Sequence, residues 1–231
     1  MIDDPNLEIL EHVASRLGSL VEEVVFLGGC ATGLLITDPA APSIRVSNDV
    51  DVIIEVASYA AYNRIAHRLR QLGFVEDAST GAPLCRWLVE QVRLDVMPTD
   101  ARILGFGNRW YKPAIASATS VTLPSGQMIR VVSAPYFVAT KLEAFHGRGE
   151  GDYLGSHDLE DLVAVVDGRP ELISEVQAHP TELRTYLAGE IGRLLNDPRF
   201  QDALPGHLPG DPASQARLSA VHDRLLAISA K

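Results

Sequence analysis

The chain has 231 residues, enough for one large domain or two small ones, and 46% of them are hydrophobic, as expected for a protein with a core. Thirty Asp and Glu against twenty Lys and Arg leave a formal charge of -10. This charge excludes the broad cationic surface of proteins that hold nucleic acid without sequence preference, although it leaves room for a local basic patch.

The remaining composition indicates a cytoplasmic protein without a membrane partner. No stretch approaches the ~20 consecutive apolar residues of a membrane helix. The acidic start Met1-Ile2-Asp3-Asp4-Pro5 lacks the basic and apolar regions of a signal peptide. Cys30 and Cys85 are both flanked by apolar residues, so we expect two buried thiols in a reducing compartment.

Strand and helix patterns alternate over residues 1–133. Hydrophobic spacing and turn residues predict, in chain order, a helix over 5–17, a strand over 24–27, a short helix over 30–36, a loop over 37–43, a strand over 50–56 with Asp49 at its entry, and a helix over 58–72 capped by Ser58. Arg64, Arg68 and Arg70 are expected on the solvated face of that last helix. Two antiparallel hairpins follow, 84–89 with 92–97 around Glu90-Gln91, and 121–123 with 128–132 around Pro124-Ser125-Gly126.

From residue 134 onward the pattern becomes helical. The spacing predicts helices over 136–146, 157–166, 171–177, 181–195 and about 213–228, with a surface loop over the proline-rich stretch 196–212. The predicted fold class is therefore α/β (α+β), a mixed-sheet core over 1–133 followed by a helical lobe over 134–231.

Two carboxylates two residues apart are the most informative feature of the front half. Residues two apart on a strand point to the same face, so Asp49 and Asp51 would direct two like charges at one point while Val50 points away. Such a pair is costly unless a cation lies between the charges. Hard oxygen ligands suit Mg²⁺ or Mn²⁺, so the pair predicts a metal site.

Two further features extend this site. Gly28-Gly29 follows a buried strand and opens a helix, which lets backbone N–H groups approach a phosphate closely. Asp95 lies in an apolar β-run and supplies a third carboxylate, with which Asp49 and Asp51 would hold two metal ions and activate an attacking hydroxyl. The alternative is that Asp95 is an exposed residue on an edge strand.

These residues carry a resemblance to a known family. Gly28-Gly29, Arg45-Val46-Ser47-Asn48-Asp49-Val50-Asp51 and the downstream Asp95 resemble the nucleotidyltransferases of the DNA polymerase β superfamily, and within it the AbiEii/AbiGii (MenT-like) toxins of type IV toxin–antitoxin systems. That group also shows a Lys-x-x-Ala-x-x-x-Arg helix followed by Asp-Leu-x-Asp-Leu, which here read Lys141 to Arg148 and Asp158 to Leu162. The interval between Gly29 and Asp49 is longer than is usual in the family because of the loop over 37–43, which we expect at the rim of the site.

The resemblance implies a magnesium-dependent enzyme that binds ATP or another NTP and transfers an NMP to an acceptor hydroxyl. Asp49, Asp51 and Asp95 would be metal ligands and catalytic residues, and Gly28, Gly29 and Ser47 would bind the nucleotide. Lys141 would offset the charge of the triphosphate; the alternative is a lysine at the edge of the core with its ammonium in solvent. Asp158 would orient Lys141 or the base of the nucleotide, or would only add favourable charge to the first turn of its helix.

The acceptor is left open by the residues. The resemblance to MenT-like toxins implies the 3′ end of a tRNA, and a cognate antitoxin as a protein partner. An acidic site would instead attract a small cationic acceptor of the aminoglycoside type. A third hypothesis is a catalytically silent nucleotide-binding module. If tRNA is the acceptor, a confined basic patch is expected.

Overall fold

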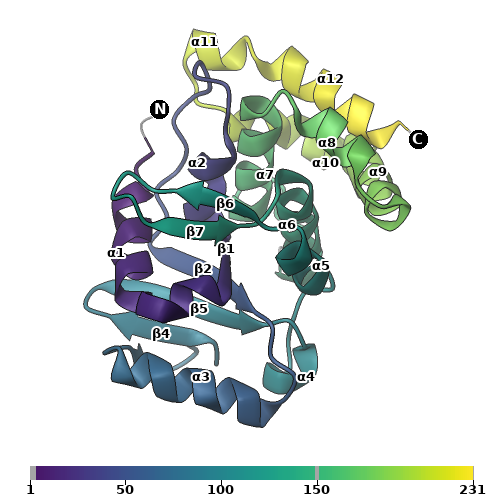
Figure 1. Cartoon of the computed structure of the whole chain (residues 1–231). Coiled ribbons are helices and arrows are strands. Elements are labelled where there is room, and N and C mark those ends of the chain that lie inside the picture. Colours follow the sequence, from purple (N-terminus) through teal and green to yellow (C-terminus); the bar gives the residue numbers. More distant parts are fainter. Residues whose placement is uncertain (1–3, 149–150, 231) are drawn as a thin grey trace. The chain divides into compact units, whose positions relative to one another are not determined.

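The computed structural model of the chain describes residues 4–148 and 151–230 (Figure 1). The chain divides into two compact units, each described here by itself. One unit contains Pro5–Leu34 and Val46–Ser133, and the other contains Leu35–Arg45 and the chain from Ala134 onward. Among the described helices, none combines the length and the apolar character that crossing a membrane requires.

The first unit is built on a seven-stranded mixed sheet with the order β3-β4-β5-β2-β1-β7-β6. Its strands are β1 (Val24–Leu27), β2 (Asp49–Ile54), β3 (Val75–Glu76), β4 (Arg86–Val89), β5 (Val92–Pro98), β6 (Thr119–Thr122) and β7 (Met128–Val131). Strand β2 lies at the centre, antiparallel to β1 and parallel to β5. Both predicted hairpins form, β4 with β5 and β6 with β7, so the predicted mixed sheet is confirmed.

The burial of these strands follows their sequences. All four residues of β1 are buried, as its wholly apolar composition predicts. On β2, Asp49 and Asp51 are partly exposed whereas Val50 and Val52 are completely buried, which is the alternation expected for a strand with one apolar face. The two acids therefore share a face.

Helices and short 3₁₀ turns complete the first unit: α1 (Leu7–Leu17), η1 (Gly18–Glu22), η2 (Gly29–Ala31), α2 (Thr32–Leu35, ending at the unit boundary), α3 (Tyr59–Gln71), α4 (Ala101–Leu104) and α5 (Tyr111–Ala116). Ser58 caps α3 as predicted, because its hydroxyl accepts a hydrogen bond from the Ala61 N–H. Tyr62 joins α3 to the sheet by donating to the Val96 carbonyl. The short elements β3, α4 and α5 were not predicted, since they are too short to show a hydrophobic period.

The second unit is helical. Its elements are α6 (Ala134–Arg148), α7 (His157–Gly168), α8 (Leu172–Ala178), α9 (Thr181–Leu195), α10 (Pro198–Ala203), η3 (Leu204–His207), α11 (Pro212–Gln215) and α12 (Leu218–Ser229). Helix α6 packs against α7, α8 and α9, and α12 packs against α7, α8 and α9. The helices predicted over 136–146, 157–166, 171–177 and 181–195 are confirmed.

The prediction of a surface loop over 196–212 is wrong. Asp197 accepts a hydrogen bond from the Arg199 N–H and caps α10, which begins at Pro198, and the 3₁₀ turn η3 follows directly. Proline is well tolerated in the first turn of a helix, so proline content alone does not indicate a loop. Phe200 is fully buried and gives this segment its anchor in the core.

Candidate functional site

Three carboxylates line up across neighbouring strands of the central sheet. Asp49 and Asp51 are two residues apart on β2, and Asp95 on β5 is the direct cross-strand partner of Asp51. Asp95 is only 7% exposed and lies on an internal strand between β4 and β2, so the alternative of an exposed edge residue is wrong. The structure thus brings the three predicted acids to one region of the sheet.

The glycine turn after β1 lies directly against Asp51. Leu27 pairs with Asp51 across β1 and β2, and Gly28 follows with φ of 75° and ψ of -171°, a conformation reserved essentially for glycine. A Cβ atom on Gly28 would fall 1.9 Å from Asp51 Oδ2. The missing side chain therefore lets backbone and carboxylate pack together, which connects the two sequence motifs physically. Gly29 is buried and begins η2.

Ser47 orients the first acid of the pair. Its hydroxyl donates to Asp49 Oδ1 at 2.9 Å, and its backbone N–H donates to Asn6 Oδ1 at 2.7 Å. Ser47 is only 4% exposed and Asn6 is completely buried. These contacts support a positioning role for Ser47 through Asp49, and the predicted contact with nucleotide stays a prediction.

Arg86 is the residue of this site that sequence reasoning missed. It faces Asp95 across the β4–β5 hairpin, and its Nε and Nη2 donate to the two Asp95 oxygens at 2.8 and 2.7 Å. The same Nη2 lies 3.7 Å from Asp49 Oδ2. A sequence signal was present, because a two-residue turn at Glu90-Gln91 places residue 86 opposite residue 95.

The charges of this region change the titration of their neighbours. Hydrogen bonding to Asp95 is the main cause of a raised pKa for the Arg86 guanidinium, which stays charged at any physiological pH. Burial, followed by the negative charges of Asp95 and Asp51, raises the pKa of the Cys85 thiol to about 12. Cys85 and Cys30 are both buried thiols outside any disulfide, as predicted.

The oxygens of Asp49, Asp51 and Asp95 are the possible ligands for a divalent cation. Asp49 and Asp51 offer hard oxygen ligands on one face, and the Asp49 side chain is 37% exposed. Asp95 differs, because both of its oxygens already accept hydrogen bonds from Arg86. Within residues 4–148 and 151–230, no group of three or more His, Cys, Asp or Glu side chains is arranged to share one ion. The residues fit a cation on Asp49 and Asp51; the predicted three-carboxylate arrangement stays a prediction.

Lys141 and Asp158 form a separate polar cluster inside the helical unit. Lys141 on α6 donates to Asp161 and Asp158 on α7, at 2.6 and 3.1 Å. Arg45 makes a bidentate contact with Asp161 at 2.8 and 2.9 Å. Lys141, Asp158 and Asp161 are each less than 8% exposed. The alternative in which the ammonium of Lys141 reaches into solvent is wrong.

This cluster holds together three segments of the helical unit. The cations Lys141 and Arg45 balance the two aspartates, so their charges already have partners. The loop that contains Arg45 is also anchored at its other end, where the N–H groups of Thr37 and Asp38 donate to the Gly168 carbonyl. The long loop thus packs on α7 within this unit.

A basic hollow of about 560 Å³ lies in the sheet unit at the C-terminal end of β2, the opposite end from Asp49. Its lining includes Ile54 and Glu55 from that end, Arg64 and Arg68 from α3, and Arg130 from β7. Arg68 pairs with Glu23 at 2.7 Å, whereas Arg64 and Arg130 donate to backbone carbonyls. In the described part of the chain, Arg64 and Arg130 form no ion pair, and the three arginines and two glutamates of the lining leave the hollow with a small positive excess.

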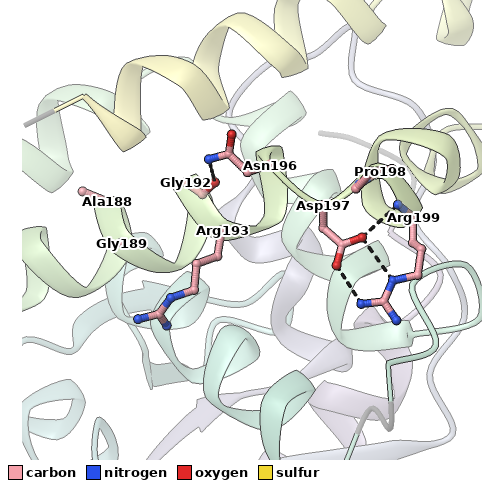
Figure 2. A pocket seen from close by; sticks show the side chains of 8 residues that line it. All are labelled: Ala188, Gly189, Gly192, Arg193, Asn196, Asp197, Pro198 and Arg199. Atoms are coloured by element: carbon pink, nitrogen blue, oxygen red, sulfur yellow. Dashed lines mark hydrogen bonds and ion pairs between the residues drawn. The ribbon is translucent and has the colours of Figure 1, made fainter.

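A second hollow of about 690 Å³ lies along α9 and the start of α10 in the helical unit (Figure 2). Gly189 and Gly192 line this hollow and contribute no side chains to it. Figure 2 shows Arg199 folded back on Asp197, and Arg193 pairs with Glu190. Because both arginines are paired with acids, this hollow has little excess charge with which to attract an anion.

Comparison with known proteins supports the fold. No model of a known protein family matches the chain, and no curated protein matches it by sequence. Among solved structures, an antigenic nucleotidyltransferase-like protein of Paracoccidioides brasiliensis matches with a TM-score of 0.53 at 22% identity, over 88% of this chain and 94% of that one. The protein JHP933 of Helicobacter pylori matches with a TM-score of 0.50 at 11% identity, over 99% and 94%. The chain has the fold of nucleotidyltransferase-like proteins.

Proposed function

We propose that this protein is a nucleotidyltransferase that transfers an NMP from an NTP to an acceptor hydroxyl. The acceptor oxygen bonds to the α-phosphorus, the bond from that phosphorus to the bridging oxygen breaks, and pyrophosphate and a proton are released. One observation carries the proposal: in a nucleotidyltransferase-like fold, the Gly28 turn packs against the carboxylate of Asp51, beside Asp49.

Each part of this arrangement has a role in the proposed reaction. The backbone N–H groups at Gly28 and Gly29, residues without side chains of their own, would contact the phosphates of the nucleotide. Asp49 and Asp51 would hold a divalent cation, Mg²⁺ or Mn²⁺, and the Ser47 hydroxyl orients Asp49 by donating a hydrogen bond to it. When bound, such a cation stabilises charge on the phosphoryl oxygens and lowers the pKa of the acceptor hydroxyl.

Lys141 is assigned a different role from the one the resemblance implies, with Asp158 orienting it, which is one of the roles expected for Asp158. Both side chains are buried, and the ammonium of Lys141 already has two carboxylate partners. These contacts support a role in holding α6, α7 and the Arg45 loop in place. We do not assign Lys141 to direct contact with the triphosphate.

For the acceptor we propose the 3′ end of an RNA such as tRNA, in a cytoplasmic toxin with a cognate antitoxin. The basic hollow supports a phosphate-rich acceptor, because the small positive excess of its lining lies on the same unit as the acid pair. Strand β2 joins the two regions, and its six residues span roughly 17 Å, a length that a few nucleotides can cover. The toxin role is supported by the resemblance at Arg45 to Asp51.

The test is a transfer assay with α-labelled NTPs, Mg²⁺, and either total tRNA or aminoglycosides as acceptors. We expect label in tRNA, and its loss in Asp49→Ala and Asp51→Ala. Thermal stability should be equal or higher in both variants, since each removes one of two close like charges. A marked fall in melting temperature would instead identify the pair as structural.

The same assay separates the competing functions. Label in aminoglycosides alone would identify a small-molecule enzyme. No label in either acceptor, with nucleotide still bound, would identify a silent binding module. Arg102→Ala is a matched control, because Arg102 is an exposed residue whose ion pair in the described part of the chain is with Asp100; it should retain activity.

A further inference from the structure

Arg86 places a fixed positive charge among the three acids. Across β4, β5 and β2, the residues Arg86, Asp95 and Asp51 occupy consecutive cross-strand positions. The guanidinium makes two hydrogen bonds to Asp95 and approaches Asp49 to 3.7 Å. It therefore lies close to the acids of both β5 and β2.

The backbone enforces this position. Arg86 and Asp95 are directly opposed in a hairpin whose two-residue turn sets the register, so the side chains meet without an unusual extension of the arginine. Their side chains are 19% and 10% exposed. A bidentate pair with this little solvent is stronger and more rigid than a surface ion pair.

The charge balance indicates what the pair does. Asp49, Asp51 and Asp95 together carry a charge of about -3, and Arg86 reduces it to about -2. A two-metal site needs carboxylates that ligate both ions, about 4 Å apart. Here one acid is turned toward the guanidinium, and the residual charge matches a single divalent cation.

We propose that Arg86 takes the place of a second metal ion, so that the site binds one divalent cation through Asp49 and Asp51. This inference rests on the proposed function. Arg86 acts as a positioning residue: it keeps Asp95 out of metal coordination and neutralises it. Replacing the guanidinium with an uncharged side chain frees Asp95 and creates a second metal site.

The experiment is a titration of the full chain with Mn²⁺, followed by electron paramagnetic resonance in the presence of an NTP analogue with a non-cleavable α,β bond. We expect one Mn²⁺ per chain in the wild type and in Arg86→Lys. We expect two in Arg86→Met, with the spectral coupling of ions about 4 Å apart. The double variant Arg86→Met/Asp95→Asn should return to one, because it lacks the freed carboxylate.

Each result decides the inference. Two ions in the wild type, or one in Arg86→Met, would overturn it while leaving the proposed function intact. No ion in the wild type would overturn the proposed function itself. Because Arg86→Met leaves a carboxylate without its partner and can unfold, the double variant Arg86→Met/Asp95→Asn, which keeps the net charge of the site at about -2, is a second test. Its Mn²⁺ affinity should stay within about twofold of the wild type, and a tenfold loss would show that Asp95 is a ligand.

Discussion

At the scale of single residues, Gly28 couples the glycine turn to the acid pair. Its φ of 75° disfavours any side chain, and the carboxylate of Asp51 occupies the space that a Cβ would need. The position of Asp51 thus depends on a residue that has no side chain. Gly105 has a similar φ of 81° but nothing within 4 Å of an added Cβ, which makes it a matched control.

We predict that Gly28→Ala disables transfer, whereas Gly105→Ala does not. Gly105→Ala should lose about 1–2 kcal/mol of unfolding free energy to its left-handed backbone, and Gly28→Ala should lose more, because its ψ of -171° lies in a region limited essentially to glycine. Only Gly28→Ala also displaces Asp51, and we expect its activity to fall by roughly a hundredfold. Urea unfolding and the labelled-NTP assay measure the two effects separately. Equal activities in the two variants would show that the contact between Gly28 and the Asp51 carboxylate does not matter for transfer.

At the scale of elements, the buried cluster at Asp161 ties α6 and the Arg45 loop to α7. Asp161 accepts hydrogen bonds from both Lys141 and Arg45, whereas Asp158 is bonded by Lys141 at a longer distance. The two acids lie one helical turn apart and are both buried, so they form a matched pair for substitution.

We predict that Asp161→Ala is the more destabilising of the two variants. It removes the carboxylate that both Lys141 and Arg45 contact at 2.6 to 2.9 Å, at a cost of about 3 kcal/mol. Asp158→Ala leaves Lys141 paired with Asp161 and should cost about 1.5 kcal/mol. Chemical unfolding of each variant measures the difference. If Asp158→Ala were instead the more destabilising variant, the stability of the cluster would depend mainly on Asp158.

At the scale of the whole molecule, the charge of -10 limits how nucleic acid is bound. A broad cationic footprint is excluded, so an RNA acceptor depends on few phosphate contacts. The basic hollow provides Arg64, Arg68 and Arg130, and one of the three is already paired with Glu23. Binding should therefore be of modest affinity, with a shallow dependence on salt.

We predict that Arg64→Ala weakens tRNA binding and Arg70→Ala does not. Both arginines lie on α3, but Arg70 pairs with Glu76 and lies outside the hollow. Loss of one contact should reduce the slope of log affinity against log salt by about 0.7. Filter binding with labelled tRNA between low and moderate salt measures this. If the slope of log affinity against log salt were unchanged in Arg64→Ala, the basic hollow would not bind the RNA acceptor.

Local patterns of the sequence determined the strands, the long helices and the geometry of the acid pair. The two-residue period of a strand places Asp49 and Asp51 on one face wherever that strand packs. The hairpin turn at Glu90-Gln91 likewise determines that residues 86 and 95 meet. These features depend only on neighbours close along the chain, so the sequence alone predicts them.

Tertiary structure decided which partners those residues contact and which of their charges are buried. Asp95 came to lie beside Asp51, and Arg86 within 3.7 Å of Asp49, because β5 lies between β4 and β2, an order that no local pattern contains. Lys141 became buried because Asp158 and Asp161 on another helix compensate its charge. Arg64 and Arg130 line one hollow although they are 66 positions apart in the sequence. Whether a charge is free for a ligand depends on what lies beside it in space, and that follows from packing between distant segments.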